Sequence, residues 1–75
     1  PILVYPNPID REITVRGADR QNIDVDILSL SGQVVLSRNV VAGEAIDLQA
    51  LTSGIYLIRI KTANELPQLF KILKK

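Results

Sequence analysis

The chain has 75 residues, 47% of them hydrophobic, and its 9 basic and 8 acidic side chains leave a net charge of +1. It contains no Cys, Met, Trp or His, which excludes disulfides, thiolate metal sites, cysteine nucleophiles and histidine acid–base chemistry. So short a chain forms at most one small domain without room for a deep active-site cleft, and its balanced charge does not favour a nucleic-acid partner.

Period-two alternation of apolar and polar residues dominates the sequence and predicts an all-β chain. Ile13 and Val15 alternate with polar neighbours, as do Ile23 and Val25, so each segment presents one apolar face. Turn residues such as Gly17-Ala18-Asp19 separate these segments. Short strands at such spacing are typical of an immunoglobulin-like antiparallel β-sandwich of about seven strands. We expect strands near residues 2–5, 12–16, 23–30, 33–38, 44–48, 55–61 and 68–73.

The first distinctive segment is Tyr5-Pro6-Asn7-Pro8. Each proline fixes φ and has no N–H to donate to a sheet, and Pro8 favours extended backbone at Asn7. Such a segment makes a stiff linker leading into the first strand, at the edge of a sheet. A part in recognition by a partner is an equally good interpretation of the same residues.

A hairpin is predicted within residues 27–35, where apolar segments flank Ser31-Gly32. Gly32 can adopt a positive φ without the penalty that a Cβ atom imposes. The apolar pattern changes phase at Ile27, Leu28 and Leu30, which indicates either a β-bulge or a strand covered on both faces. On these grounds the role of the segment is structural.

The segment from Leu51 to Ile60 combines a turn with a strongly alternating strand. Gly54 is predicted to reverse or kink the chain, after which Tyr56, Ile58 and Ile60 face the core. Tyr56 can bury its ring while its hydroxyl reaches a partner at the edge of the sheet. The local role is again structural.

The last ten residues contain Lys71, Lys74 and Lys75 and no acidic residue, so the chain ends with a small basic cluster. A closing strand here buries part of the apolar set and is expected to leave the lysines pointing outward. Two interpretations stay open. The lysines either solvate an edge strand and oppose aggregation, or form a docking surface.

Together these four segments resemble the C-terminal sorting domain, type A, of the type IX (Por) secretion system. The shared pattern is Tyr5-Pro6-Asn7-Pro8, an apolar hairpin with a central Gly32, then Leu51-x-x-Gly54-x-Tyr56-x-x-x-Ile60, and a lysine-containing apolar end. The likeness extends from Val4 to Lys75. The chain differs from the family at Leu28-Ser29, where Tyr-Asp is frequent, at Gln33, where a basic residue is frequent, and at Pro67, where a Gly-containing turn is usual.

The resemblance implies that residues 1–75 form a single C-terminal sorting domain of a longer exported protein, with a passenger domain N-terminal to Pro1. It implies transit through the periplasm, recognition by the type IX translocon, and delivery to the cell surface or the medium. A sortase-like peptidase commonly removes such a domain and attaches the passenger to the surface. Within the motifs, Gly54 and Tyr56 are assigned to the fold, and Pro6, Asn7, Pro8 and the terminal lysines to the signal.

Two other functions fit a small β-sandwich. An adhesion or carbohydrate-binding module needs aromatic side chains to stack on sugar rings, and only Tyr5, Tyr56 and Phe70 are available. The other is a structural domain that is retained and packs on a neighbour.

Chemistry at a carboxylate pair is a weaker alternative. Asp24 and Asp26 share the outward face of one predicted strand, but two side chains cannot supply the roughly six to eight oxygens of a calcium site. We therefore favour a solvated polar face there. We expect no enzyme activity, metal, cofactor or transmembrane segment.

Overall fold

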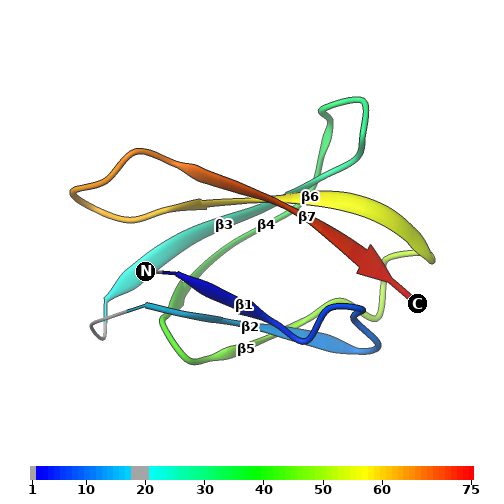
Figure 1. Ribbon diagram of the computed structural model, residues 1–75, viewed down its shortest axis with the longest axis horizontal. Helices are drawn as coiled ribbons and strands as arrows, with labels where there is room; N and C mark the ends of the chain where they lie inside the picture. The colour runs from blue at the N-terminus through cyan, green and yellow to red at the C-terminus, as the bar shows by residue number, and fades with distance from the viewer. Residues whose placement is uncertain (1, 18–20) are drawn as a thin grey trace.

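The computed structural model describes residues 2–17 and 21–75, which form seven strands and no helix (Figure 1). Each predicted strand is confirmed, with its ends shifted by a few residues at most. Ala18 and Asp19, expected in a turn, lie outside the described residues. No helix in the described ranges is long and apolar enough to cross a membrane. The strands are β1 (Leu3–Tyr5), β2 (Glu12–Arg16), β3 (Asn22–Leu28), β4 (Val34–Val41), β5 (Ala45–Asp47), β6 (Gly54–Lys61) and β7 (Gln68–Lys74).

The strands form two antiparallel sheets that lie one above the other (Figure 1). One sheet has the order β1-β2-β5 and the other the order β4-β3-β6-β7. In the nomenclature of immunoglobulin domains these are strands A-B-E facing C′-C-F-G. The predicted immunoglobulin-like sandwich is therefore confirmed by the strand order as well as by the all-β content.

The core lies between the two sheets and consists of their inward-facing aliphatic side chains. Alternation places these residues on one face of each strand, as in β2, where Ile13 and Val15 are buried and Glu12 and Arg16 are exposed. Removing this apolar area from water stabilises the packing of one sheet on the other. The core cluster comprises Ile9, Ile13, Val15, Ile23, Val25, Ile27, Ile46, Leu48, Ile58, Ile60 and Ile72.

A β-bulge accounts for the change of phase near residue 28. Ile27 pairs with Leu36, but Leu28 pairs with Val34, so one residue of β4 is left over. In the connecting turn, Gly32 has φ of +93° and its N–H donates to the Ser29 carbonyl at 2.9 Å. The prediction of a hairpin in which Gly32 adopts a positive φ is confirmed.

Candidate recognition site

Asn7 joins the proline-containing segment to the last strand. Its Oδ1 atom accepts a hydrogen bond from the Leu73 N–H at 3.0 Å, and its Nδ2 atom donates to the Lys71 carbonyl at 3.4 Å. These partners are 66 and 64 residues away in sequence. A side-chain amide that both accepts and donates can substitute for a strand residue along a sheet edge. The two sequence motifs assigned to the signal therefore meet in space.

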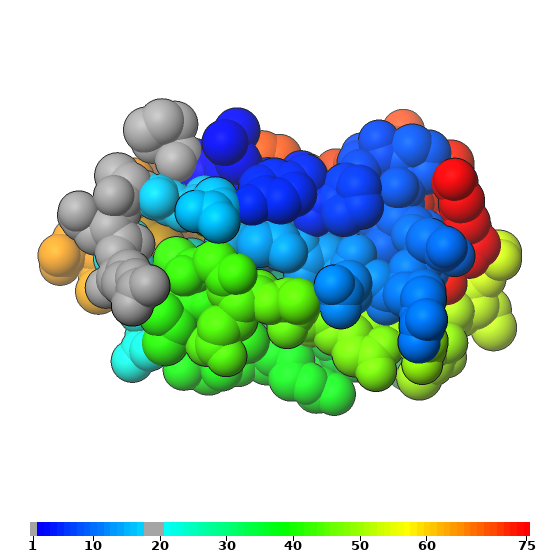
Figure 2. Space-filling model, turned by 90° about the horizontal axis from the view of Figure 1, so that it is seen from below, coloured from blue at the N-terminus to red at the C-terminus, as the bar shows by residue number. Residues whose placement is uncertain are grey.

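Ile9 continues the same contact through its backbone. Its N–H donates to the Leu73 carbonyl and its carbonyl accepts from the Lys75 N–H, each at 2.7 Å, in a parallel bridge with Lys74. The Ile9 side chain is 0% exposed and lies in the core. In Figure 2 the red C-terminal segment lies directly beside the blue N-terminal one. Residues 7–9 thus cover part of the free edge of β7 and block further strand pairing there.

Pro6 and Pro8 are both exposed, and each is preceded by a cis peptide bond. They follow β1 and connect it to β2, so the expectation of a linker leading into the first strand is wrong. The segment leaves the β1-β2-β5 sheet, touches β7 of the other sheet and returns to β2. Because proline nitrogen cannot donate, the contacts with β7 come from Asn7 and Ile9.

The terminal lysines do not share one environment. Lys71 and Lys75 are exposed, as predicted, but Lys74 is only 7% exposed, and the expectation of an outward side chain is wrong for it. The Lys74 Nζ atom donates to the Lys75 carbonyl at 2.8 Å. The cause is strand alternation, which turns residue 74 to the same face as the buried Ile72, whatever its charge.

Gly54 and Tyr56, which the sequence assigned to the fold, both lie at the start of β6. Gly54 opens β6 with φ of +153°, a conformation that other residues rarely adopt. The Tyr56 ring packs against the core, and its hydroxyl donates to the Thr52 carbonyl at 2.7 Å. A tyrosine near the start of strand F that bonds the backbone upstream is the tyrosine corner of immunoglobulin-like domains. The sequence motif around Gly54 thus marks a structural corner.

Tyr5 is the most exposed of the chain's three aromatic residues, at 39%. Its hydroxyl accepts a hydrogen bond from Arg16 Nε at 2.6 Å, across the β1–β2 pair. Tyr56 and Phe70 both pack against the core. A single exposed ring offers no platform of stacked aromatic groups for a sugar, which disfavours the adhesion interpretation.

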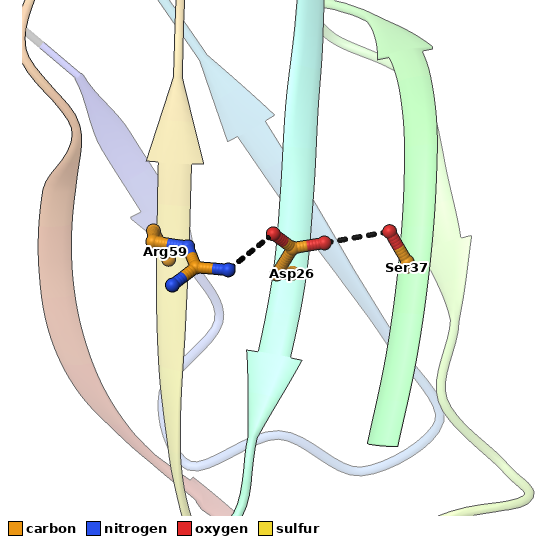
Figure 3. A network of polar contacts seen from close by, with 3 residues as sticks. All are labelled: Asp26, Ser37 and Arg59. Carbon is orange, nitrogen blue, oxygen red and sulfur yellow. Dashed lines mark hydrogen bonds and ion pairs between the residues drawn. The ribbon is translucent and has the colours of Figure 1, made fainter. Parts of the chain in front are cut away.

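Asp24 and Asp26 lie on the outer face of the larger sheet, each with polar partners. Figure 3 shows Asp26 between Ser37 and Arg59, whose atoms lie at 2.6 and 2.8 Å from its carboxylate oxygens. Asn39 donates to Asp24 at 2.7 Å. The Ser37 hydroxyl and then Arg59 lower the pKa of Asp26, although partial burial opposes them. Sequence reasoning missed Ser37, Asn39 and Arg59, because nothing in the sequence indicated which strands flank β3.

This arrangement gives the two carboxylates a structural role. Both carboxylate oxygens of Asp26 accept hydrogen bonds, from Ser37 and from Arg59, and these bonds favour the ionised form in the folded state. Within residues 2–17 and 21–75, no group of three or more potential ligand residues could hold a metal ion. The face is a ladder of cross-strand polar pairs.

Comparison with known families matches residues 3–75 to the secretion system C-terminal sorting domain. A comparison with curated proteins finds no match for the chain. The family match spans every strand, from Leu3 in β1 to Lys74 in β7, and so includes both partners of the Asn7 contact. This chain belongs to the family of secretion system C-terminal sorting domains.

Proposed function

We propose that this chain directs an attached passenger protein across the outer membrane through the type IX secretion system. The observation that carries the proposal is the family match over residues 3–75. The immunoglobulin-like sandwich supports it, because a self-contained sandwich can be appended to a passenger without depending on the passenger's own fold. The chain then acts as the export signal of the passenger to which it is attached.

The finer steps follow the same proposal. Residues 1–75 form one sorting domain at the C-terminal end of a longer protein, with the passenger N-terminal to Pro1. The protein passes through the periplasm, the type IX translocon recognises the domain, and a sortase-like peptidase removes it as the passenger is attached to the surface. The contact of Asn7 and Ile9 with β7 fits a domain that is recognised in its folded state, because the loop after β1 is fixed only when the last strand has formed.

The residues proposed for recognition are the exposed ones around this contact: Tyr5, Pro6, Asn7, Pro8, Lys71 and Lys75. Lys74 belongs instead with Gly32, Gly54 and Tyr56 as a residue of the fold, because its side chain is buried. The exposed set draws on both ends of the chain, and the Asn7 contact brings these ends together in the folded domain.

The proposal is tested by fusing the chain to an unrelated periplasmic reporter in a cell that has a type IX system. We expect the fusion at the cell surface or in the medium, and the reporter alone in the periplasm. A folded parent fusion that stays in the periplasm would show that the sorting function is wrong. The readouts are fractionation of the reporter and circular dichroism of the purified chain.

The lysines are tested in the same assay with Lys71 and Lys75 changed to Gln and Lys74 left unchanged. Exposed substitutions of this kind shift stability by about 0.5 kcal/mol or less, so the fold is retained. We expect export to fall. If this double variant is exported normally, the two lysines only protect the sheet edge and take no part in recognition. The Pro6–Pro8 segment would then be the next one to substitute.

A further inference from the structure

One row of side chains crosses the outer face of all four strands of the larger sheet. Val34 pairs with Leu28, Leu28 with Leu57, and Leu57 with Lys71. Directly paired residues point to the same side of a sheet, and Lys71 is exposed, so the whole row faces outward. Leu28 fits this placement, because it is buried and yet is not part of the core cluster.

The neighbouring pair, Ile55 and Leu73, extends the row toward the end of β7. Val34, Ile55 and Leu73 are 46%, 45% and 43% exposed. We call Leu28, Val34, Ile55, Leu57, Lys71 and Leu73 the apolar face. Isolated exposed aliphatic residues need no explanation. This set crosses the whole sheet, which makes it a candidate interaction surface.

The charge of this face is positive. Lys71 lies within it, and the exposed Lys75 follows directly after β7. The adjacent row carries Asp26, but Ser37 and Arg59 occupy its carboxylate. In the part of the chain that the structure describes, Arg59–Asp26 is the one ion pair, so no carboxylate neutralises Lys71. A partner with apolar groups and nearby carboxylates is therefore complementary to the apolar face.

Other occupants fit less well. A second copy docked through the same face in a two-fold dimer would bring two copies of Lys71 into one interface, where like charges repel. An anionic lipid surface is usually bound by clusters of roughly four to eight basic residues, more than Lys71 and Lys75 provide. A sugar would need aromatic rings, and the apolar face contains none.

We propose that the apolar face docks onto a protein surface of the export apparatus that is apolar and carries carboxylates. This inference rests on the proposed sorting function and specifies the side of the domain that is bound. Burial of the three exposed aliphatic side chains supplies the affinity, and Lys71 supplies orientation and selectivity.

The test uses the reporter fusion in a type IX-competent cell with two matched triple variants. The face variant is Val34→Thr, Ile55→Thr and Leu73→Thr, which keeps strand-favouring side chains and removes apolar surface. The control variant is Leu3→Thr, Val41→Thr and Leu66→Thr, three exposed aliphatic residues outside the apolar face. We expect export of the face variant to fall by about tenfold or more and export of the control to match the parent.

Lys71→Glu provides a second variant that changes a single exposed side chain and leaves the core untouched. We expect Lys71→Glu to reduce export while circular dichroism shows an unchanged fold. We expect Lys71→Arg, which keeps the positive charge, to be exported as well as the parent. Circular dichroism and melting of each purified chain separate a loss of docking from a loss of folding.

The outcomes distinguish the two proposals. If the parent is exported and the folded face variant and Lys71→Glu are exported equally well, the docking proposal is wrong and the sorting function stands. If the folded parent is not exported, both are wrong. If sedimentation shows that the parent is a dimer and the face variant a monomer, the face binds a second copy, and the docking proposal is overturned.

Discussion

The hydroxyl of Tyr56 ties the start of β6 to the loop before it, through the hydrogen bond to the Thr52 carbonyl. The ring packs on the core from the same position, so one side chain contributes both apolar burial and a directed polar contact. Tyr5 makes a hydrogen bond of similar length with Arg16, but Tyr5 and Arg16 are both exposed. Substituting the two tyrosines in turn therefore compares the hydrogen bond of the Tyr56 corner with the exposed hydrogen bond of Tyr5.

Tyr56→Phe is expected to lower the free energy of unfolding by about 1 kcal/mol, because it removes the hydroxyl and keeps the ring. Tyr5→Phe is the matched control and is expected to change stability by less than about 0.5 kcal/mol, since water can replace its partner. Urea unfolding of the three proteins measures both values. Equal losses for the two variants would contradict the structural role of the Tyr56 corner.

Asp26 makes the free energy of unfolding depend on pH. Its pKa is lowered in the folded chain, first by the Ser37 hydroxyl and then by Arg59, so the unfolded chain binds a proton more readily. The contribution is therefore fully present above the ordinary aspartate pKa of about 4 and is lost as the pH falls through the lower, folded value. We expect unfolding to become easier over that acidic range.

Asp26→Asn is expected to flatten this part of the pH profile, because the variant has no carboxylate to protonate at that position. Ser37→Ala is expected to raise the pKa of Asp26 toward its ordinary range, since it removes the largest cause of the shift. Urea unfolding at several acidic pH values and NMR titration of the Asp26 carboxyl measure the two effects. An unchanged pKa in Ser37→Ala would assign the shift to Arg59 alone.

At the scale of elements, the contact between residues 7–9 and β7 is the feature that shapes the candidate site. β7 pairs along its whole length with β6 on one side, while its other edge is met only by Asn7 and Ile9 among the described residues. A strand edge covered in this way presents fewer free N–H and C=O groups. The last strand is therefore stabilised by the first loop of the chain.

Asn7→Ala is expected to expose the Leu73 N–H and to destabilise the chain by about 1 kcal/mol through the loss of its acceptor. Amide hydrogen exchange at Leu73, followed by NMR, should become faster, while amides in β2 and β3 change little. Asn64→Ala, at an exposed residue of the loop between β6 and β7, is the matched control. Unchanged exchange at Leu73 in Asn7→Ala would show that the Asn7 contact does not hold the strand.

At the scale of the whole molecule, both sheets pack on one cluster of aliphatic side chains, and Ile9 belongs to it. Ile9 lies in neither sheet, but its backbone bonds to β7 and its side chain fills the space between the sheets. A small protein with one shared core unfolds as a unit, because neither sheet keeps its apolar face covered without the other.

Ile9→Ala is expected to cost about 2–4 kcal/mol, because it leaves a cavity in the core. Leu66→Ala, at a residue 86% exposed, is the control and should change stability little. Urea unfolding monitored by circular dichroism and by tyrosine fluorescence should give coincident transitions in every variant. Separate transitions for the two probes would show that the chain does not unfold in one step.

The sequence alone was sufficient to predict the strands, the turn at Gly32 and the inward position of Tyr56, and near Leu28 it left a bulge as one of two alternatives. These features depend on the two-residue period of a strand and on the backbone freedom of glycine, both of which are local. The motifs also indicated the family, and the comparison confirms it. The candidate residues were identified individually, without any indication that the two ends of the chain touch.

The tertiary structure decided which of those residues meet. The Asn7–Leu73 contact joins positions 66 residues apart, and the Asp26–Arg59 pair depends on β3 and β6 being neighbours. Lys74 is a separate case, because its charge predicted exposure while the alternation along β7 places it on the same face as the buried Ile72. Local patterns determine which way a side chain points on its own strand, but the partner across the sheet is set only when distant segments pack together.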